Sequence, residues 1–277
     1  MFPENELHLV QQLADLFSAL PQVEAVGMGG SQANEQTQID STSDIDLYVF
    51  THSEIPMQVR WEIVEKTGGS SRAEMGLNYW GPNDTWHHLP SGVEIDNNFF
   101  DTGWMEEQID RVLLHHEPSL GYTTCFWHTI RKMKILTDPR GWLSRLQTRC
   151  TVDYPEPLRR NIINFNHKVL RSVIPAYAYQ LEKAIKRGDI ISTNHRLAGL
   201  LASYFDIIFA LNRQTHPGEK RLLELVPDTC PLLPVDMDTD IRAVLRCAAE
   251  NLKELDDQVN LLLDHLDELL RREGLLE

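Results

Sequence analysis

The feature that most constrains the fold is an apolar run in which aspartates occupy alternate positions. Asp44 and Asp46 flank Ile45, and residues 47–50 are Leu, Tyr, Val and Phe. Such a run predicts a β-strand, in which side chains two positions apart lie on the same face of the sheet. Two carboxylates on one face repel each other, and a divalent cation held between them relieves that cost. The run therefore predicts a metal site on a strand.

A glycine pair and a serine come before this run. Residues 23–28 have the pattern of a short strand, and Gly29, Gly30 and Ser31 follow it directly. A backbone without Cβ atoms lets a ligand approach closely, and its amide hydrogens can point at an anion. We therefore expect an anion-binding turn, formed by these three residues, beside the carboxylates.

A third acidic segment lies at residues 92–100, with the sequence GVEIDNNFF. Its alternation predicts a strand whose Glu94, Asp96 and Asn98 share one face. A carboxylate from this strand can complete a two-metal site with the two aspartates of the first run. Spacing alone does not decide between Glu94 and Asp96 as the ligand. If Asp96 is the ligand, Glu94 is a general base, an outer partner of the site or an exposed partner of a lysine.

Beyond residue 118 the sequence has helical periodicity almost to its end. The expected helices cover residues 124–136, 142–149, 157–187, 191–212, 220–226 and 240–272. The helix at 191–212 is apolar around its circumference, which predicts the buried centre of a bundle. In the last helix apolar residues recur in steps of three and four, and this seam either packs along the chain's own bundle, the favoured interpretation, or forms a homodimer.

These elements predict an α+β protein with two domains. Residues 1–118 are expected to form a mixed sheet with flanking helices, and residues 119–277 an all-helical bundle. A ligand site is expected in the cleft between the two domains, where such sites are common.

Composition restricts the partners and the compartment. The formal net charge of −15 at pH 7 disfavours a nucleic-acid partner, because such proteins normally present a basic surface. The N-terminus has no basic segment before an apolar stretch, and no apolar run is long enough to span a bilayer. The four cysteines are widely scattered and match neither a disulfide framework nor a metal knuckle. We therefore expect a cytoplasmic protein that does not bind membranes.

Three of these motifs together resemble the signature of the DNA polymerase beta-like nucleotidyltransferase superfamily: Gly30-Ser31, Asp44-x-Asp46 and Asp96. The resemblance is specific over residues 29–49. The helical half resembles that of the bacterial aminoglycoside-type members, most visibly at residues 207–225, IIFALNRQTHPGEKRLLEL. The loop between the serine and the first aspartate departs from the family, since it is a little long and lacks the Arg or Gly often found there.

This resemblance implies an enzyme that moves a nucleotidyl group, AMP from ATP in the simplest case, onto a hydroxyl of a small acceptor and releases pyrophosphate. Asp44 and Asp46 would bridge two Mg²⁺ ions about 3.5 to 4 Å apart, and Asp96 would hold the ion that activates the acceptor hydroxyl. Amides near Gly30 and the Ser31 hydroxyl would take the β- and γ-phosphates.

A cation for the triphosphate is expected from the helical half. Lys220 is the first choice, because it stands at the start of an expected helix, where anions are favoured. Lys132 and Lys134 are alternatives. The acidic charge of the chain also favours a small acceptor, and a cationic one in particular.

Two other classes of function fit the same motifs. The chain could be an antitoxin-like nucleotidyltransferase module that modifies or binds a partner protein, or a nucleotide-binding regulator without catalysis. Intact metal ligands argue against the inert versions. The identity of the acceptor and of the nucleoside triphosphate is not encoded in any motif of the sequence.

Overall fold

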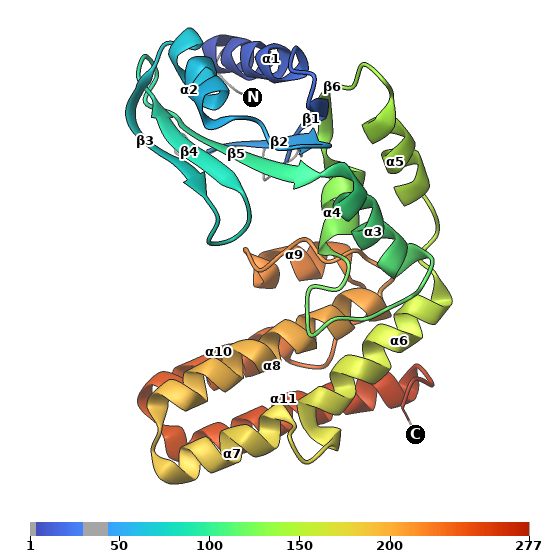
Figure 1. Cartoon of the computed structure of the whole chain (residues 1–277). Helices are drawn as coiled ribbons and strands as arrows, with labels where there is room; N and C mark the ends of the chain where they lie inside the picture. Colours follow the sequence, from blue (N-terminus) through green and yellow to red (C-terminus); the bar gives the residue numbers. More distant parts are fainter. Residues whose placement is uncertain (1–3, 30–43, 277) are drawn as a thin grey trace. The chain divides into compact units, whose positions relative to one another are not determined.

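The computed structural model describes residues 4–29 and 44–276, which form two compact units (Figure 1). The sheet unit comprises Met1–Asp110 and Thr129–Val152, and the helical unit comprises Arg111–His128 and Asp153–Glu277. The boundary expected at residue 118 therefore lies inside a segment of the helical unit. After that segment the chain returns to the sheet unit before it enters the helical unit for good.

Within the described residues, six strands form a single mixed sheet in the order β3-β4-β5-β2-β1-β6. The strands are β1 (Val23–Met28), β2 (Ile45–Thr51), β3 (Ser70–Leu77), β4 (Asn83–His88), β5 (Glu94–Asp101) and β6 (Lys134–Thr137). β2 and β5 run parallel, and the other neighbouring strands of this described sheet run antiparallel. The helices of this unit are α1 (Glu4–Ser18), α2 (Met57–Lys66) and α5 (Trp142–Cys150), while α3 (Thr102–Leu113) and α4 (Cys125–Lys132) each run from one unit into the other. The expected α+β class is confirmed.

The two faces of the sheet differ because apolar and polar residues alternate along β2 and β5. Ile45, Leu47 and Val49 are fully buried in a core that includes Leu13 and Phe17 of α1. Burying one such side chain stabilises the fold by about 1.5–3 kcal/mol. Figure 1 shows α1 and α2 on this side of the sheet. The alternate residues of β2 and β5 consequently point to the opposite face.

The sixth strand differs from the helix expected at residues 124–136. α4 ends at Lys132, and β6 then pairs antiparallel with β1, placing Ile135 opposite Gly27. Met133 is buried against Gly27, where a Cβ atom would lie 2.2 Å from the Met133 sulfur. The missing side chain in β1 thus makes room for the residue at which the helix changes into a strand.

The helical unit contains more breaks than the sequence periodicity indicates. Its elements are α6 (Glu156–His167), a π-helix (Lys168–Ser172), α7 (Tyr177–Arg187), α8 (Ile190–Leu211), α9 (Leu222–Thr229), α10 (Met237–Glu250) and α11 (Leu252–Arg272). The helix expected at 157–187 is interrupted before Pro175, which has no amide hydrogen to donate within a helix. The helix expected at 240–272 is broken at Asn251, whose φ of −148° and ψ of 79° are not helical.

The apolar seam of the last helix packs inside the unit. Its side chains in α11 are buried, namely Leu255, Val259, Leu262, Leu266 and Leu269. α10 and α11 pack on each other, and α11 also contacts α7. This use of the seam agrees with the favoured interpretation from the sequence, in which the seam belongs to the chain's own bundle.

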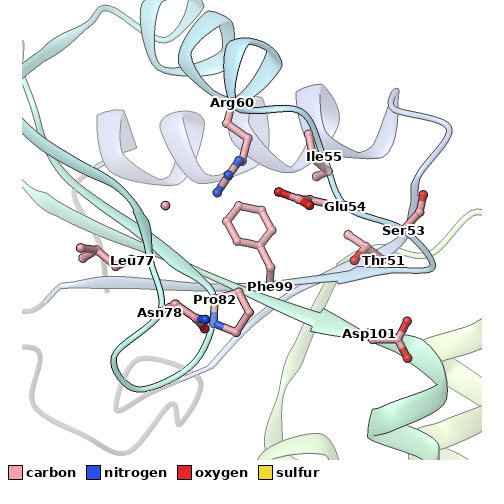
Figure 2. A pocket seen from close by; sticks show the side chains of 11 residues that line it. Thr51, Ser53, Glu54, Ile55, Arg60, Leu77, Asn78, Pro82, Phe99 and Asp101 are labelled. Atoms are coloured by element: carbon pink, nitrogen blue, oxygen red, sulfur yellow. The ribbon is translucent and has the colours of Figure 1, made fainter.

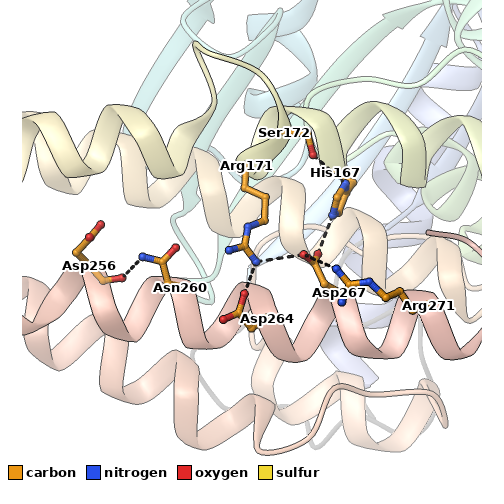
Figure 3. Close-up of polar contacts among 8 residues, drawn as sticks. All are labelled: His167, Arg171, Ser172, Asp256, Asn260, Asp264, Asp267 and Arg271. Carbon is orange, nitrogen blue, oxygen red and sulfur yellow. Dashed lines mark hydrogen bonds and ion pairs between the residues drawn. The ribbon is translucent and has the colours of Figure 1, made fainter. Parts of the chain in front are cut away.

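Ionic contacts join α11 to the π-helix (Figure 3). Arg171 of the π-helix donates hydrogen bonds to Asp264, at 2.5 Å, and to Asp267, at 3.1 Å. Nε2 of His167 lies 2.7 Å from Asp267, which is itself buried. A buried carboxylate needs such partners, because an unpaired charge in the interior is costly.

A second buried carboxylate ties α8 to the segment before α4. Asp206 accepts hydrogen bonds from the amide and the hydroxyl of Thr123, at 3.1 and 2.6 Å, and from the Asn166 side chain at 3.1 Å. Burial raises the pKa of Asp206 to about 7, although these three donors oppose the shift. The predicted buried centre of the bundle is confirmed for the later part of α8, where Leu200, Ile207 and Ile208 are fully covered, whereas Ile190 and Ile191 at its start are exposed.

No helix among the described residues combines the length and the apolar character needed to cross a membrane.

Candidate active site

The acidic residues of the sheet unit come together because β2 and β5 are neighbouring parallel strands. Their register pairs Ile45 with Ile95 and Asp46 with Asp96. Both isoleucines are fully buried, so both aspartates belong to the face away from α1 and α2. Residues 44 and 94 lie two positions before the paired aspartates and therefore share their face.

Three carboxylates on this face are mutually close. Asp44, Glu94 and Asp96 each offer an oxygen atom, and these atoms all lie within 4.8 Å of one another. Two unit charges about 5 Å apart repel by about 3 kcal/mol at an effective dielectric constant of about 20. Solvent screens part of this cost, because Asp44 is exposed and the Glu94 side chain is 37% exposed. A group of this kind is chemically suited to a divalent cation with hard oxygen ligands, such as Mg²⁺.

Asp46 lies beside this group without belonging to the mutually close three. It is half-buried and stands opposite Asp96 in the strand register. Its charge also reaches Tyr48, the next residue on the same face of β2. Burial, together with the charges of Asp46 and Asp96, raises the pKa of Tyr48 to about 12. The Tyr48 phenol therefore stays protonated at neutral pH and can only act there as a neutral hydroxyl.

Side chains of β4, the strand on the other edge of β5 from β2, lie beside the two carboxylates of β5. Thr85 stands opposite Asp96 and donates a hydrogen bond from its hydroxyl to that carboxylate. His87 stands opposite Glu94, with Nε2 3.6 Å from a Glu94 oxygen. Neither residue could be predicted from the sequence as a neighbour of the carboxylates, because only the register of β4 against β5 identifies them.

Gly29 is needed at the end of β1 for a steric reason. Its amide donates to the carbonyl of Asp46 at 3.1 Å, so that hydrogen is already used within the sheet. A Cβ atom at this position would lie 2.3 Å from a carbon of the Tyr48 ring. Gly29 thus lets the tyrosine lie against the backbone beside the carboxylates. Of the expected anion-binding turn, Gly30 and Ser31 lie outside the described residues.

The three candidate lysines lie in different parts of the chain. Lys220 is an exposed residue of the helical unit, two positions before α9 begins. Lys132 and Lys134 are exposed residues of the sheet unit, at the end of α4 and the start of β6. The contact of any of them with a triphosphate stays a prediction.

Comparison with known proteins finds a family model and a solved structure that are similar to parts of this chain or to its fold. Residues 126–222 match a family model described as a domain of unknown function, DUF4037. A search of curated proteins found no match. The chain is similar to the crystal structure of a nucleotidyltransferase-like protein from Exiguobacterium sibiricum 255-15, at 11% identity and a TM-score of 0.44. That match covers 96% of this chain and 79% of the other.

Proposed function

We propose that the carboxylate face of β2 and β5 is the active site of a metal-dependent nucleotidyltransferase. The enzyme would move a nucleotidyl group, AMP from ATP in the first instance, onto a hydroxyl of a small acceptor and release pyrophosphate. The observation that carries the proposal is the convergence of Asp44, Glu94 and Asp96 within 4.8 Å, with Asp46 opposite Asp96. The sequence resemblance described above supports the same reaction.

Carboxylate oxygens on one sheet face are the donor set that Mg²⁺ ions require. Asp44, Asp46 and Asp96 would hold two ions. When bound, these ions supply charge neutralisation at the attacking and leaving oxygens of an in-line displacement at phosphorus. Thr85 fixes one oxygen of Asp96 through its hydrogen bond and leaves the other free to face a ligand.

Glu94 has two roles that its position supports. It belongs to the mutually close group, so it can serve as the third metal ligand in place of Asp46 or in addition to it. It can also accept the proton of the acceptor hydroxyl as a general base. His87 lies beside the Glu94 carboxylate in either case, with its ring nitrogen 3.6 Å away.

The phosphates and the acceptor complete the proposal. The amide of Gly29 is used by Asp46, so the phosphate contacts fall to Gly30 and Ser31, with Lys220 as the cation. An acidic face favours a small hydroxylated acceptor that carries positive charge. All four cysteines lie in the described residues and none of them forms a disulfide there, in keeping with the proposed cytoplasmic location.

The first experiment measures pyrophosphate release from each of the four common nucleoside triphosphates with Mg²⁺, with acceptor classes added one at a time. Asp46→Asn and Asp96→Asn should each lower turnover by about 100-fold or more, because each removes charge that stabilises the transition state. The double variant should be scarcely worse than the more damaging single one, since the residues act as a unit.

Glu62→Gln is the matched control, because it removes one carboxylate from the exposed surface of α2. A melting experiment with Mg²⁺ and each triphosphate runs in parallel, since a ligand that binds only the folded state stabilises it by about 2.7 kcal/mol at 100 times its Kd. Normal turnover in Asp46→Asn would refute the proposed nucleotidyltransferase activity. Binding of nucleotide without any pyrophosphate release would favour a regulator instead.

A further inference from the structure

The sheet unit contains a cavity of about 440 Å³ on the face opposite the carboxylates (Figure 2). It is bounded by the loop after β2, the first turns of α2, the turn between β3 and β4, and the end of β5. Its volume lies within the range of about 300–1,000 Å³ that is typical of small-molecule sites. None of the residues discussed for nucleotidyl transfer lines it.

A buried arginine forms one wall of this cavity. Arg60 of α2 is 8% exposed, and its guanidinium donates to Oδ1 of the fully buried Asp84 at 2.8 Å. The same oxygen accepts the Gly76 amide at 2.7 Å. Within the described part of the chain, Nε of Arg60 and Oδ2 of Asp84 have no hydrogen-bond partner. Both atoms are covered by the protein, and the ion pair with Asp84 holds the guanidinium in place at the cavity wall.

Two carboxylates, those of Glu54 and Asp101, also line the cavity. Glu54 lies in the exposed loop between β2 and α2 and lines the cavity. Figure 2 shows the Glu54 carboxylate and the Arg60 guanidinium pointing toward the Phe99 ring from different sides. The guanidinium carbon is 5.2 Å from the centre of that ring. Ile55 and Leu77 add apolar surface to the lining.

We propose that this cavity binds a small zwitterion of the α-amino-acid class with an apolar side chain. The ligand carboxylate accepts from Arg60, the ammonium group faces Glu54, and the side chain packs on Phe99, Ile55 and Leu77. A simple anion would leave the Glu54 charge without a counterpart, and a simple cation would face the guanidinium. Only a ligand with both charges matches the guanidinium as well as the carboxylates of Glu54 and Asp101.

This site is separate from the proposed active site although both use the same two strands. β2 contributes Asp46 near its start and Thr51 at its end, and these residues lie on opposite faces of the sheet. β5 does the same with Asp96 and Phe99. Occupancy of the cavity can therefore be measured without nucleotide or metal, and its result is independent of the proposed transferase activity.

The test is isothermal titration calorimetry on the full chain with L-leucine and L-phenylalanine as probes. Two leucine analogues on the wild-type protein separate the charges: 3-methylbutylamine lacks the carboxylate, and 4-methylpentanoate lacks the ammonium group. A hydrogen bond to a charged group is worth about 1.5–3 kcal/mol, so each analogue should bind at least about tenfold more weakly than leucine. This comparison needs no variant and so does not depend on Arg60, whose loss would leave Asp84 buried without its partner.

Glu54→Gln should weaken leucine binding about tenfold, while Glu62→Gln, on α2 outside the cavity, should leave it unchanged. Saturable binding of either amino acid with these losses supports the proposal. It is overturned if neither amino acid binds at millimolar concentration, if the analogues bind as tightly as leucine, or if Glu54→Gln binds leucine like the wild type.

Discussion

The hydroxyl of Thr85 fixes the geometry of one proposed metal ligand. It donates a hydrogen bond to Asp96 from the neighbouring strand. Thr85→Val keeps the shape of the side chain but removes that bond. We expect kcat/KM for pyrophosphate release to fall by about 10- to 100-fold, the usual effect of losing a partner of a metal ligand. Thr85→Ser keeps the hydroxyl and should retain most of the activity, and equal activity in the valine and serine variants would contradict this role.

Gly29 gives a prediction about stability at the same scale. Gly29→Ala places a methyl group against the Tyr48 ring, where the Cβ atom would lie 2.3 Å from a ring carbon. Overpacking of this kind costs about 1–3 kcal/mol of unfolding free energy, measurable by urea denaturation. In Tyr48→Leu the ring is absent, so adding Gly29→Ala should cost clearly less there than in the wild type. Equal costs in the two backgrounds would show that the ring is not the reason for glycine.

The alternation of side chains along a strand was sufficient to predict which acidic residues of each segment share a face. Asp44, Asp46 and Asp96 follow from alternation within their own segments, as does Glu94. Which three lie closest depends on the parallel register of two strands that are far apart in sequence, and no local pattern specifies that register. The contacts that β4 makes with the carboxylates depend on a further register, that of β4 against β5. They could not be predicted from the sequence for the same reason.

Among the elements, α8 depends on a carboxylate that is expected to make stability vary with pH. The folded pKa of Asp206 is about 7, above its ordinary value of 3.8. Between these values the folded state holds a proton that the unfolded state has released. The contribution of Asp206 to stability therefore falls as pH rises from about 4 to about 7, by up to about 4 kcal/mol.

A second buried group, His216, has its pKa lowered to about 3, so its contribution to stability rises with pH over pH 3–6.5. Because Asp206→Asn keeps His216, the difference between this variant and the wild type isolates the effect of Asp206. Unfolding free energies from urea denaturation at pH 5 and pH 7.5 should show the wild type losing stability relative to the variant as pH rises. Asp228→Asn, an exposed change in α9, should not alter the pH dependence. A constant difference between Asp206→Asn and wild type would contradict the prediction.

Element types were predicted better than element ends. The helical periodicity at 157–187 and 240–272 is real, but it continues on both sides of Pro175 and Asn251, where the backbone leaves the helix. Apolar spacing does not record such a break when the segments on both sides bury apolar faces. β6 is four residues long, too short for its own alternation to compete with the preceding helix.

At the scale of the whole molecule, the interleaved units predict where the chain can be cut. A fragment of residues 1–118 lacks β6 and α5, together with Met133, which directly precedes β6, and Leu143 of α5, both of which pack on Gly27. A fragment of residues 1–152 retains them. We expect the longer fragment to unfold cooperatively and the shorter one to have a lower urea midpoint and to bind a hydrophobic dye, because its apolar surface is exposed. Circular dichroism and size-exclusion chromatography check this, and equal midpoints would mean that β6 does not stabilise the sheet.

The strand order also determines how long β1 lacks one of its two partner strands during synthesis. β1 lies between β2 and β6, and β6 is translated roughly 100 residues after β1. At about 5–20 residues per second, the ribosome delivers that last partner roughly 5–20 s later. During this interval one edge of β1 has unpaired amide and carbonyl groups, which are a template for pairing with other chains. The nascent protein is thus most exposed to misassembly after its proposed catalytic strands have been made and before the edge beside them is closed.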